Sequence, residues 1–122
     1  EMLELLRITE ELKKQMRLKN LPLVNLEIKD DTLKIDPKSI LYLLPSDNGT
    51  IMQTLEKKRY FYKSVSSIAN QLPESMFVTV QRGRVINIIH VKQYYKKEII
   101  MKDGQKFLVS DNYLNDLLEK VD

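Results

Sequence analysis

Short runs in which every second residue is apolar recur along this chain, and turn-forming residues separate them. Residues 23–29 and 32–35 alternate on either side of Asp30-Asp31, as the two strands of a hairpin do. Asn48-Gly49 predicts a tight type I′ turn, and Asp103-Gly104 predicts another hairpin. The runs predicted as strands are 23–29, 32–35, 39–44, 50–55, 59–62, 76–80, 85–89, 97–101 and 106–109, which leaves 90–96 as a basic connection. The pattern predicts a mainly β fold, with elongated antiparallel sheets and two or three short helices.

The apolar spacing is helical in three segments. Residues 1–20 carry one apolar stripe, which predicts a linker or packing helix; a stripe of roughly two heptads gives less support to a coiled coil. Ser64 can cap a short helix that ends before Pro73, and Ser110 can cap a last helix towards the C-terminus. Residues 21–122 contain no further linker, so we expect them to form one domain.

The composition excludes several kinds of chemistry. The 122 residues carry a net charge of +3, three glycines, one histidine and no cysteine. Without cysteine there is no disulfide framework, thiolate zinc site or thiol nucleophile, and no phosphate-binding glycine loop is visible. We therefore expect no enzyme, no cofactor and no metal site. The chain also lacks a run of apolar residues long enough to span a membrane and a signal-peptide pattern, which predicts a cytoplasmic protein.

Positive charge is concentrated between Gln81 and Lys106. This segment has seven cations and two anions, although the whole chain carries an excess of only three positive charges. The basic part of the chain is internal and lies between acidic segments. A charge run on a small protein is usually a solvated face. An internal excess of this size is also typical of a surface that binds a polyanion such as nucleic acid.

A set of short motifs follows a fixed order along the chain. Phe77, Val80, Arg82 and Gly83 form a strand that ends in an Arg-small pair, and Asn87 interrupts the next apolar run. The further matches are Val85, Ile86, Asp103, Gly104, Val109, Ser110 and Tyr113, with Ile40-Leu41-Tyr42-Leu43 and Gln71-Leu72-Pro73 upstream. In this order and spacing, residues 21–122 resemble the LytTR family of bacterial DNA-binding domains.

The resemblance implies an elongated β fold whose loops reach the DNA major groove. It implies the effector domain of a bacterial transcriptional regulator in a two-component system, which binds double-stranded promoter DNA with sequence specificity. It further implies a pair of modules on direct repeats, as a homodimer on the DNA, and a receiver domain ahead of residue 1. The DNA-binding residues that follow from the resemblance and the charge pattern are Ser46, Asp47, Asn48, Gln81, Arg82, Arg84, Asn87, Lys92, Lys96 and Lys97.

Side-chain chemistry divides these residues into readers and anchors. An amide such as that of Asn87 can pair with adenine, and Arg82 or Arg84 can bond guanine or a phosphate through two parallel hydrogen bonds. The three lysines suit phosphates, which fix register without reading sequence. Asn87 has an alternative role as a structural amide that bonds the backbone at a strand end. The lone His90 is interpreted as structural rather than as a metal ligand or a general base.

Two departures from the family pattern bear on these roles. Ser110-Asp111 stands where the family commonly has Ser-Arg, so an anion replaces a cation near the DNA. Gln81 and Gly83 stand where the family often has His or Lys and then Ser. Both departures leave the fold prediction unchanged. The anion should weaken or redirect the DNA contact at its position.

Two other functions compete with DNA binding. The acidic segments and Asp111 favour a protein-interaction or dimerisation module on the same fold, with reduced or lost DNA binding. The aromatic cluster Tyr60-Phe61-Tyr62 gives weaker support to an RNA-binding module, since strand residues of this kind usually divide between core and surface. A DNA-binding domain that uses a basic surface should lose affinity steeply as salt increases.

Overall fold

The computed structural model describes residues 23–28 and 31–114, and most of them lie in short strands. The elements in chain order are β1 (Val24–Ile28), β2 (Asp31–Ile35), η1 (Pro37–Ser39), β3 (Ile40–Ser46), β4 (Gly49–Thr54), β5 (Lys58–Phe61), α2 (Val65–Ala69), β6 (Phe77–Gln81), β7 (Arg84–Asn87), η2 (Ile88–His90), β8 (Val91–Tyr95), β9 (Glu98–Met101) and β10 (Lys106–Leu108). The predicted mainly β, antiparallel fold is confirmed. The predicted helix over 1–20 lies outside the described residues, as does most of the last helix, of which residues 111–114 are described and helical.

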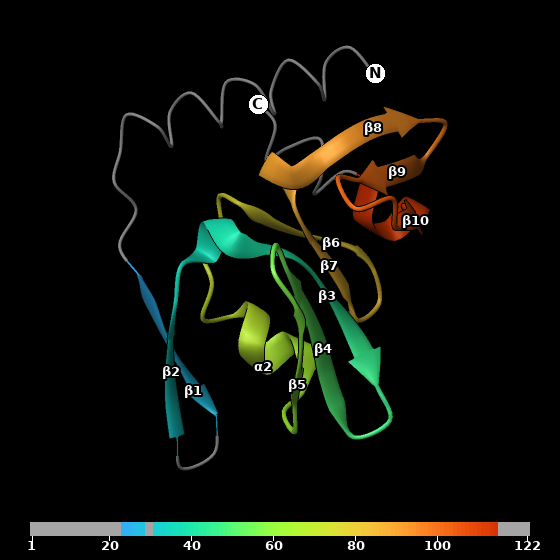
Figure 1. Cartoon of the computed structure of the whole chain (residues 1–122). Coiled ribbons are helices and arrows are strands. Elements are labelled where there is room, and N and C mark those ends of the chain that lie inside the picture. Colours follow the sequence, from blue (N-terminus) through green and yellow to red (C-terminus); the bar gives the residue numbers. More distant parts are fainter. Residues whose placement is uncertain (1–22, 29–30, 115–122) are drawn as a thin grey trace.

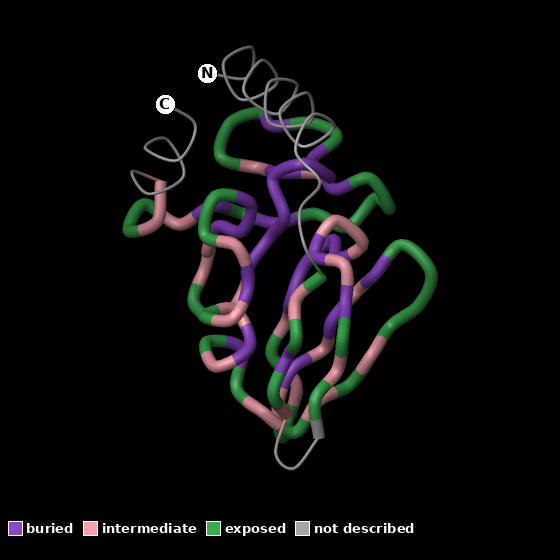
Figure 2. The backbone as a smooth tube through the Cα atoms, turned by 90° about the vertical axis from the view of Figure 1, so that its left-hand side faces the viewer, coloured by how far each residue is buried: buried purple, intermediate pink, exposed green. Residues whose placement is uncertain are grey.

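The strands form three sheets that stack in layers (Figure 1). The central sheet has the order β5-β4-β3-β7-β6, the second has the order β10-β9-β8, and β1-β2 is a separate hairpin. Every pairing is antiparallel. Helix α2 lies against the central sheet, and Figure 2 shows the buried residues along the strands and the exposed ones mainly at the turns. Within the described part of the chain, no helix is long and apolar enough to cross a membrane.

The central sheet contributes side chains to two separate cores. On one face Leu43 packs in a cluster with Ile68 of α2 and Leu26 of the β1-β2 hairpin. On the other face Tyr42 packs in a second cluster with Phe107 of the small sheet, and their rings meet edge to face at 5.2 Å. Because neighbouring strand residues point to opposite faces, β3 and β7 bury side chains on both sides of the sheet.

Strand β8 lies within the segment that the sequence predicts as a basic connection. Its buried residues are Val91 and Tyr94, three positions apart, because the pairing with β9 shifts register between Val91 and Gln93. A bulge of this kind adds a residue to one strand and breaks the alternation of apolar and polar residues. The period of two that marks the other strands is therefore absent from this one.

The hairpin predicted at Asn48-Gly49 forms, but its turn is not of type I′. The strands pair through Ser46 and Gly49, so Asp47 and Asn48 are the central residues. A type I′ turn needs positive φ at both central residues. Among the described non-glycine residues, only Lys96 and Lys97 have positive φ, at 49° and 64°. The left-handed two-residue turn is thus the one between β8 and β9.

A glycine is required at position 49, because the neighbouring strand leaves no room for a Cβ atom. A Cβ at Gly49 would lie 1.9 Å from the carbonyl oxygen of Phe61 on the neighbouring strand. Phe61 pairs with Thr50 in the β4-β5 ladder, so the two backbones meet closely where β4 begins. The glycine allows β5 to approach the β3-β4 turn, rather than supplying the left-handed backbone that its sequence context suggests.

Asn87 joins β7 to three other elements from inside the protein. It has no exposed surface, and its Nδ2 donates to the carbonyls of Ile40 at 2.8 Å and Pro37 at 3.3 Å. Its Oδ1 accepts from the backbone N–H of Ile89 at 3.2 Å. The side chain thereby fixes the end of β7 to the start of β3 and to both 3-10 turns.

Replacement of Asn87 by Ala should destabilise the fold. The change leaves buried backbone groups without these partners, so we expect a loss of about 1–3 kcal/mol in the free energy of unfolding. Urea unfolding followed by circular dichroism measures this loss. Gln93→Ala, which removes an exposed amide from β8, is the control and should change stability by less than about 0.5 kcal/mol. Equal stabilities of the two variants would contradict the structural role.

A buried tyrosine fastens the small sheet to the central one. The Tyr42 hydroxyl donates to Oδ2 of Asp103 at 2.7 Å, and Oδ1 of Asp103 accepts from the backbone N–H of Gln105 at 3.0 Å. Burial, followed by the hydrogen bond to the Asp103 carboxylate, raises the pKa of the Tyr42 phenol well above its ordinary value. The phenol therefore stays protonated in the folded protein when exposed tyrosines begin to ionise.

Tyr42→Phe should lower stability by about 1 kcal/mol at neutral pH, because one hydrogen bond between the sheets is lost. The folded pKa is raised, so the contribution of the hydroxyl is complete below the unfolded pKa near 10. Above that pH the unfolded chain releases this proton while the folded chain keeps it, and the advantage of the wild type shrinks. Urea titrations of both proteins between pH 7 and about 10.5 test this. A difference in stability that grows with alkaline pH would contradict the prediction.

Candidate nucleic-acid interface

Two turns of the central sheet lie next to each other. Strands β3 and β7 are antiparallel neighbours with Leu43 opposite Val85, so the β3-β4 turn and the β6-β7 turn project from the same end of the sheet. A Cβ at Gly83 would lie 3.6 Å from Cγ of Pro45, which is ordinary contact distance. Gly83 has a φ of +76°, a conformation that suits glycine at this turn. Ser46, Asp47 and Asn48 are thereby brought close to the turn that carries Arg82.

Two backbone hydrogen bonds hold the segment that follows β10, one to the central sheet and one to the β8-β9 turn. The N–H of Ser110 donates to the carbonyl of Val80 at 2.9 Å, directly before the β6-β7 turn. The N–H of Val109 donates to the carbonyl of Lys97 at 2.7 Å, in the β8-β9 turn. Three turns and the start of the last helix therefore form one surface. We call it the turn face, and it consists of residues 46–48, 81–84, 96–97 and 110–113.

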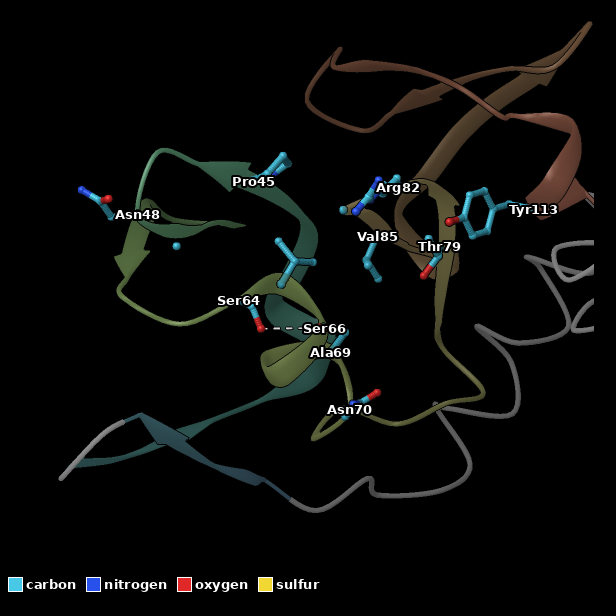
Figure 3. A pocket seen from close by; sticks show the side chains of 13 residues that line it. Pro45, Asn48, Ser64, Ser66, Ala69, Asn70, Thr79, Arg82, Val85 and Tyr113 are labelled. Carbon is cyan, nitrogen blue, oxygen red and sulfur yellow. Dashed lines mark hydrogen bonds between the residues drawn. The ribbon is translucent and has the colours of Figure 1, made fainter.

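A cleft of about 680 Å³ opens on the turn face (Figure 3). Arg82 and Tyr113 point into it from one side, and α2 forms its floor with Ser66 and Asn70. Asn48 stands at the far edge of the cleft. Its walls come from segments far apart in the chain, so the cleft exists only in the folded domain. The groups along it combine amides, hydroxyls and one guanidinium.

The charges on the turn face are mixed. Arg82, Arg84, Lys96 and Lys97 are its cations, and Asp47 and Asp111 are its anions. Arg82 is exposed and Arg84 is half-buried. The Lys96 ammonium lies 5.2 Å from the centre of the Tyr95 ring, a cation–π distance that holds it beside the turn.

Lys97 forms an ion pair with Asp111. Its Nζ donates to Oδ1 of the carboxylate, and the hydrogen bond raises the pKa of the Lys97 ammonium. Both side chains remain largely exposed. The anion that departs from the family pattern thus partly neutralises one of the lysines assigned to phosphate.

Two of the predicted DNA-binding residues do not lie on the turn face. Asn87 is buried and hydrogen-bonded within the protein, so the expectation that it reads a base is corrected in favour of its structural role. Lys92 is exposed on β8, about 13 Å along the strand from Lys96. Lys102 and Lys106 flank the turn at the opposite end of β9, so the basic segment divides between two ends of the small sheet.

The structure brings further residues to the turn face that the charge pattern could not identify. Tyr113 reaches the cleft because helical residues 111–114 begin beside Val80. Tyr60 on the edge strand β5 and Tyr62 directly after it are 66% and 72% exposed, and both border a smaller pocket with Ser46–Asn48. The sequence identifies both as members of an aromatic cluster, but only the fold places them beside the β3-β4 turn.

The chain is similar to known proteins in sequence. The sequence model of the LytTr DNA-binding domain family matches residues 30–122. The curated "Sensory transduction protein LytT" of Bacillus subtilis (strain 168) is 28% identical over 97 residues, which are 75% of this chain and 40% of that protein. The chain thus spans less than half the length of this relative.

A solved structure shares the fold. The LytTr DNA-binding domain of a protein described as a methyl-accepting/DNA response regulator from Bacillus cereus is similar with a TM-score of 0.67. The two are 20% identical, and the match covers 84% of this chain and 98% of the other. The family match extends over more than half of the residues. This chain belongs to the LytTr DNA-binding domain family.

Proposed function

We propose that the turn face is the surface by which this domain binds double-stranded DNA with sequence specificity. The observation that carries the proposal is the convergence of three turns and one helix start, from two sheets, on a single surface. Loops that project from the end of a rigid sheet are suited to binding, because the strands fix their positions. The cleft between them adds concave surface for base edges.

Arg82 and Asn48 are the proposed base readers. Arg82 is exposed at a tight turn, and a guanidinium can bond O6 and N7 of guanine through two parallel hydrogen bonds. Asn48 is exposed across the cleft, and its amide can pair with N6 and N7 of adenine. Gln81, Ser46 and Asp47 flank the two readers and can position them or bond bases at the edges of the site.

Arg84, Lys96 and Lys97 are the proposed phosphate anchors. Cations at the β6-β7 and β8-β9 turns would hold the duplex along the turn face and fix its register. Lys92 would reach only a flanking phosphate, because of its distance along β8.

We also infer a larger assembly around the domain. Binding by two copies on direct repeats and a receiver domain before residue 1 are both compatible with a chain that spans 40% of its relative. The solved relative from Bacillus cereus, which is a domain of a response regulator, supports the same organisation. No catalytic role is part of this proposal, and the domain would act inside the cell, where promoter DNA lies.

A protein-interaction or dimerisation module is the second candidate. The Lys97–Asp111 ion pair favours it, because an anion on the turn face opposes phosphate. Light scattering on the isolated domain, with and without duplex DNA, separates the two functions. A stable dimer that binds no duplex would support this candidate and overturn the first.

The affinity for duplex DNA should fall as the salt concentration rises, with a slope set by the number of phosphates that the anchors neutralise. With three or four phosphates neutralised, we expect a slope of about −3 in a plot of log affinity against log salt. Lys96→Met should reduce the magnitude of this slope by about 0.9. Lys102→Met is the matched control, since it removes an exposed lysine at the other end of β9. Fluorescence anisotropy at several salt concentrations measures all three slopes, and equal effects of both variants would contradict the assigned face.

Arg82→Ala should cost about 1–3 kcal/mol in binding to a cognate duplex and clearly less on random DNA, because a base contact is lost together with one charge. Arg82→Lys keeps the charge but not the planar pair of donors. It should bind random DNA as the wild type does and still lose affinity for the cognate site. Anisotropy with both duplexes measures this. Equal losses on cognate and random DNA would make Arg82 an anchor instead of a reader.

A further inference from the structure

We propose that Asp111 is a specificity-determining residue, whose carboxylate accepts a hydrogen bond from the N4 amino group of a cytosine in the major groove. This inference rests on the proposed function, since it assigns a role to a residue of the turn face. Asp111 carries a negative charge, which does not suit a surface that binds a polyanion, and the inference gives this residue a role in selecting a base pair.

The location of Asp111 follows from its neighbours. Ser110, directly before it, is bonded to Val80 at the base of the β6-β7 turn, and the Asp111 carboxylate is paired with Lys97 in the β8-β9 turn. The Asp111 side chain is 79% exposed. It is therefore accessible to a duplex that lies along the turn face between the β6-β7 and β8-β9 turns.

A carboxylate at this place can bond only a restricted set of groups on DNA. An ionised Asp is an acceptor only, and phosphates offer acceptors alone, so the two repel. The donors that the major groove presents are the amino groups of cytosine N4 and adenine N6. A carboxylate in contact with the duplex can therefore be satisfied only by one of these bases or by a bridging water.

Cytosine is favoured over adenine by the neighbouring atoms. Adenine presents the N7 acceptor beside its amino group, which repels a carboxylate but suits an amide. Cytosine presents N4 without an adjacent acceptor on its own edge. An Asp at this position should thus prefer cytosine, and an Asn should prefer adenine.

Lys97 is a positioning residue for this contact. Its ammonium bonds Oδ1 of Asp111, and the carboxylate keeps lone pairs on both oxygens for a further acceptor bond. The backbone of Lys97 is itself held by the Val109 N–H at 2.7 Å, so the ion pair has a fixed base. The positive charge also offsets the repulsion between Asp111 and the nearest phosphates.

Selection of bound duplexes from a random pool tests the inference. The wild type should enrich cytosine at one position by about 5-fold, Asp111→Asn should enrich adenine there, and Asp111→Ala should show no preference there. The other positions of the recognition sequence should be unchanged in all three. Lys96→Met is the control and should lower the affinity for every duplex without changing the preferred bases.

A modified duplex gives a second measurement that does not depend on the pool. A 2-pyrimidinone in place of the selected cytosine removes the amino group alone. The wild type should then lose about 5-fold in affinity, and Asp111→Ala should lose none. Circular dichroism verifies that the variants fold.

The outcomes separate this inference from the function on which it rests. A wild-type domain that enriches no sequence overturns the proposed function and this inference together. A wild type that enriches a sequence which both Asp111 variants retain overturns this inference alone, and Asp111 then only moderates the charge of the face. Equal affinities of the wild type for the cytosine and 2-pyrimidinone duplexes overturn it in the same way.

Discussion

The fold depends on the division of β3 side chains between the two faces of the central sheet. Leu43 holds α2 and the β1-β2 hairpin, and Tyr42 holds the small sheet through Phe107 and Asp103. A strand buried on both sides is difficult to deform, because a shift in its register would expose both cores at once. The β3-β4 turn is therefore carried by one of the most constrained strands of the molecule, and so its position relative to β7 is well defined.

The turn face is assembled across sheets instead of within one. The backbone hydrogen bond from Ser110 to Val80 joins the end of the small sheet to β6, directly before the β6-β7 turn, and the bond from Val109 to Lys97 fixes the β8-β9 turn beside it. Asn87 acts at the opposite end of β7, where its amide joins β3 and both 3-10 turns. Polar side chains of this domain thus serve two separate purposes, internal connection at one end of β7 and an accessible surface at the other.

Sequence periodicity predicted the strands whose alternation is regular, and the motif order predicted the family. Periodicity did not identify β8, because a bulge places the buried residues Val91 and Tyr94 three positions apart instead of two. The sequence pattern predicted a left-handed turn at Asn48-Gly49, whereas the glycine is needed there because the Phe61 carbonyl leaves no room for a Cβ. Of the candidate site, the turn residues and Arg82 lie together, but Asn87 is internal, since an amide that follows an apolar run is equally suited to bonding backbone. Such differences depend on contacts between distant segments, which a single sequence does not display.

The backbone at Lys96 and Lys97 has a consequence of its own. Both residues adopt left-handed φ, which for residues with a Cβ costs on the order of 1 kcal/mol each, and glycine or asparagine would avoid most of this cost. A turn optimised for folding alone would not contain two adjacent lysines. The two lysines therefore place two ammonium groups at the tip of the hairpin at a cost to the stability of the fold.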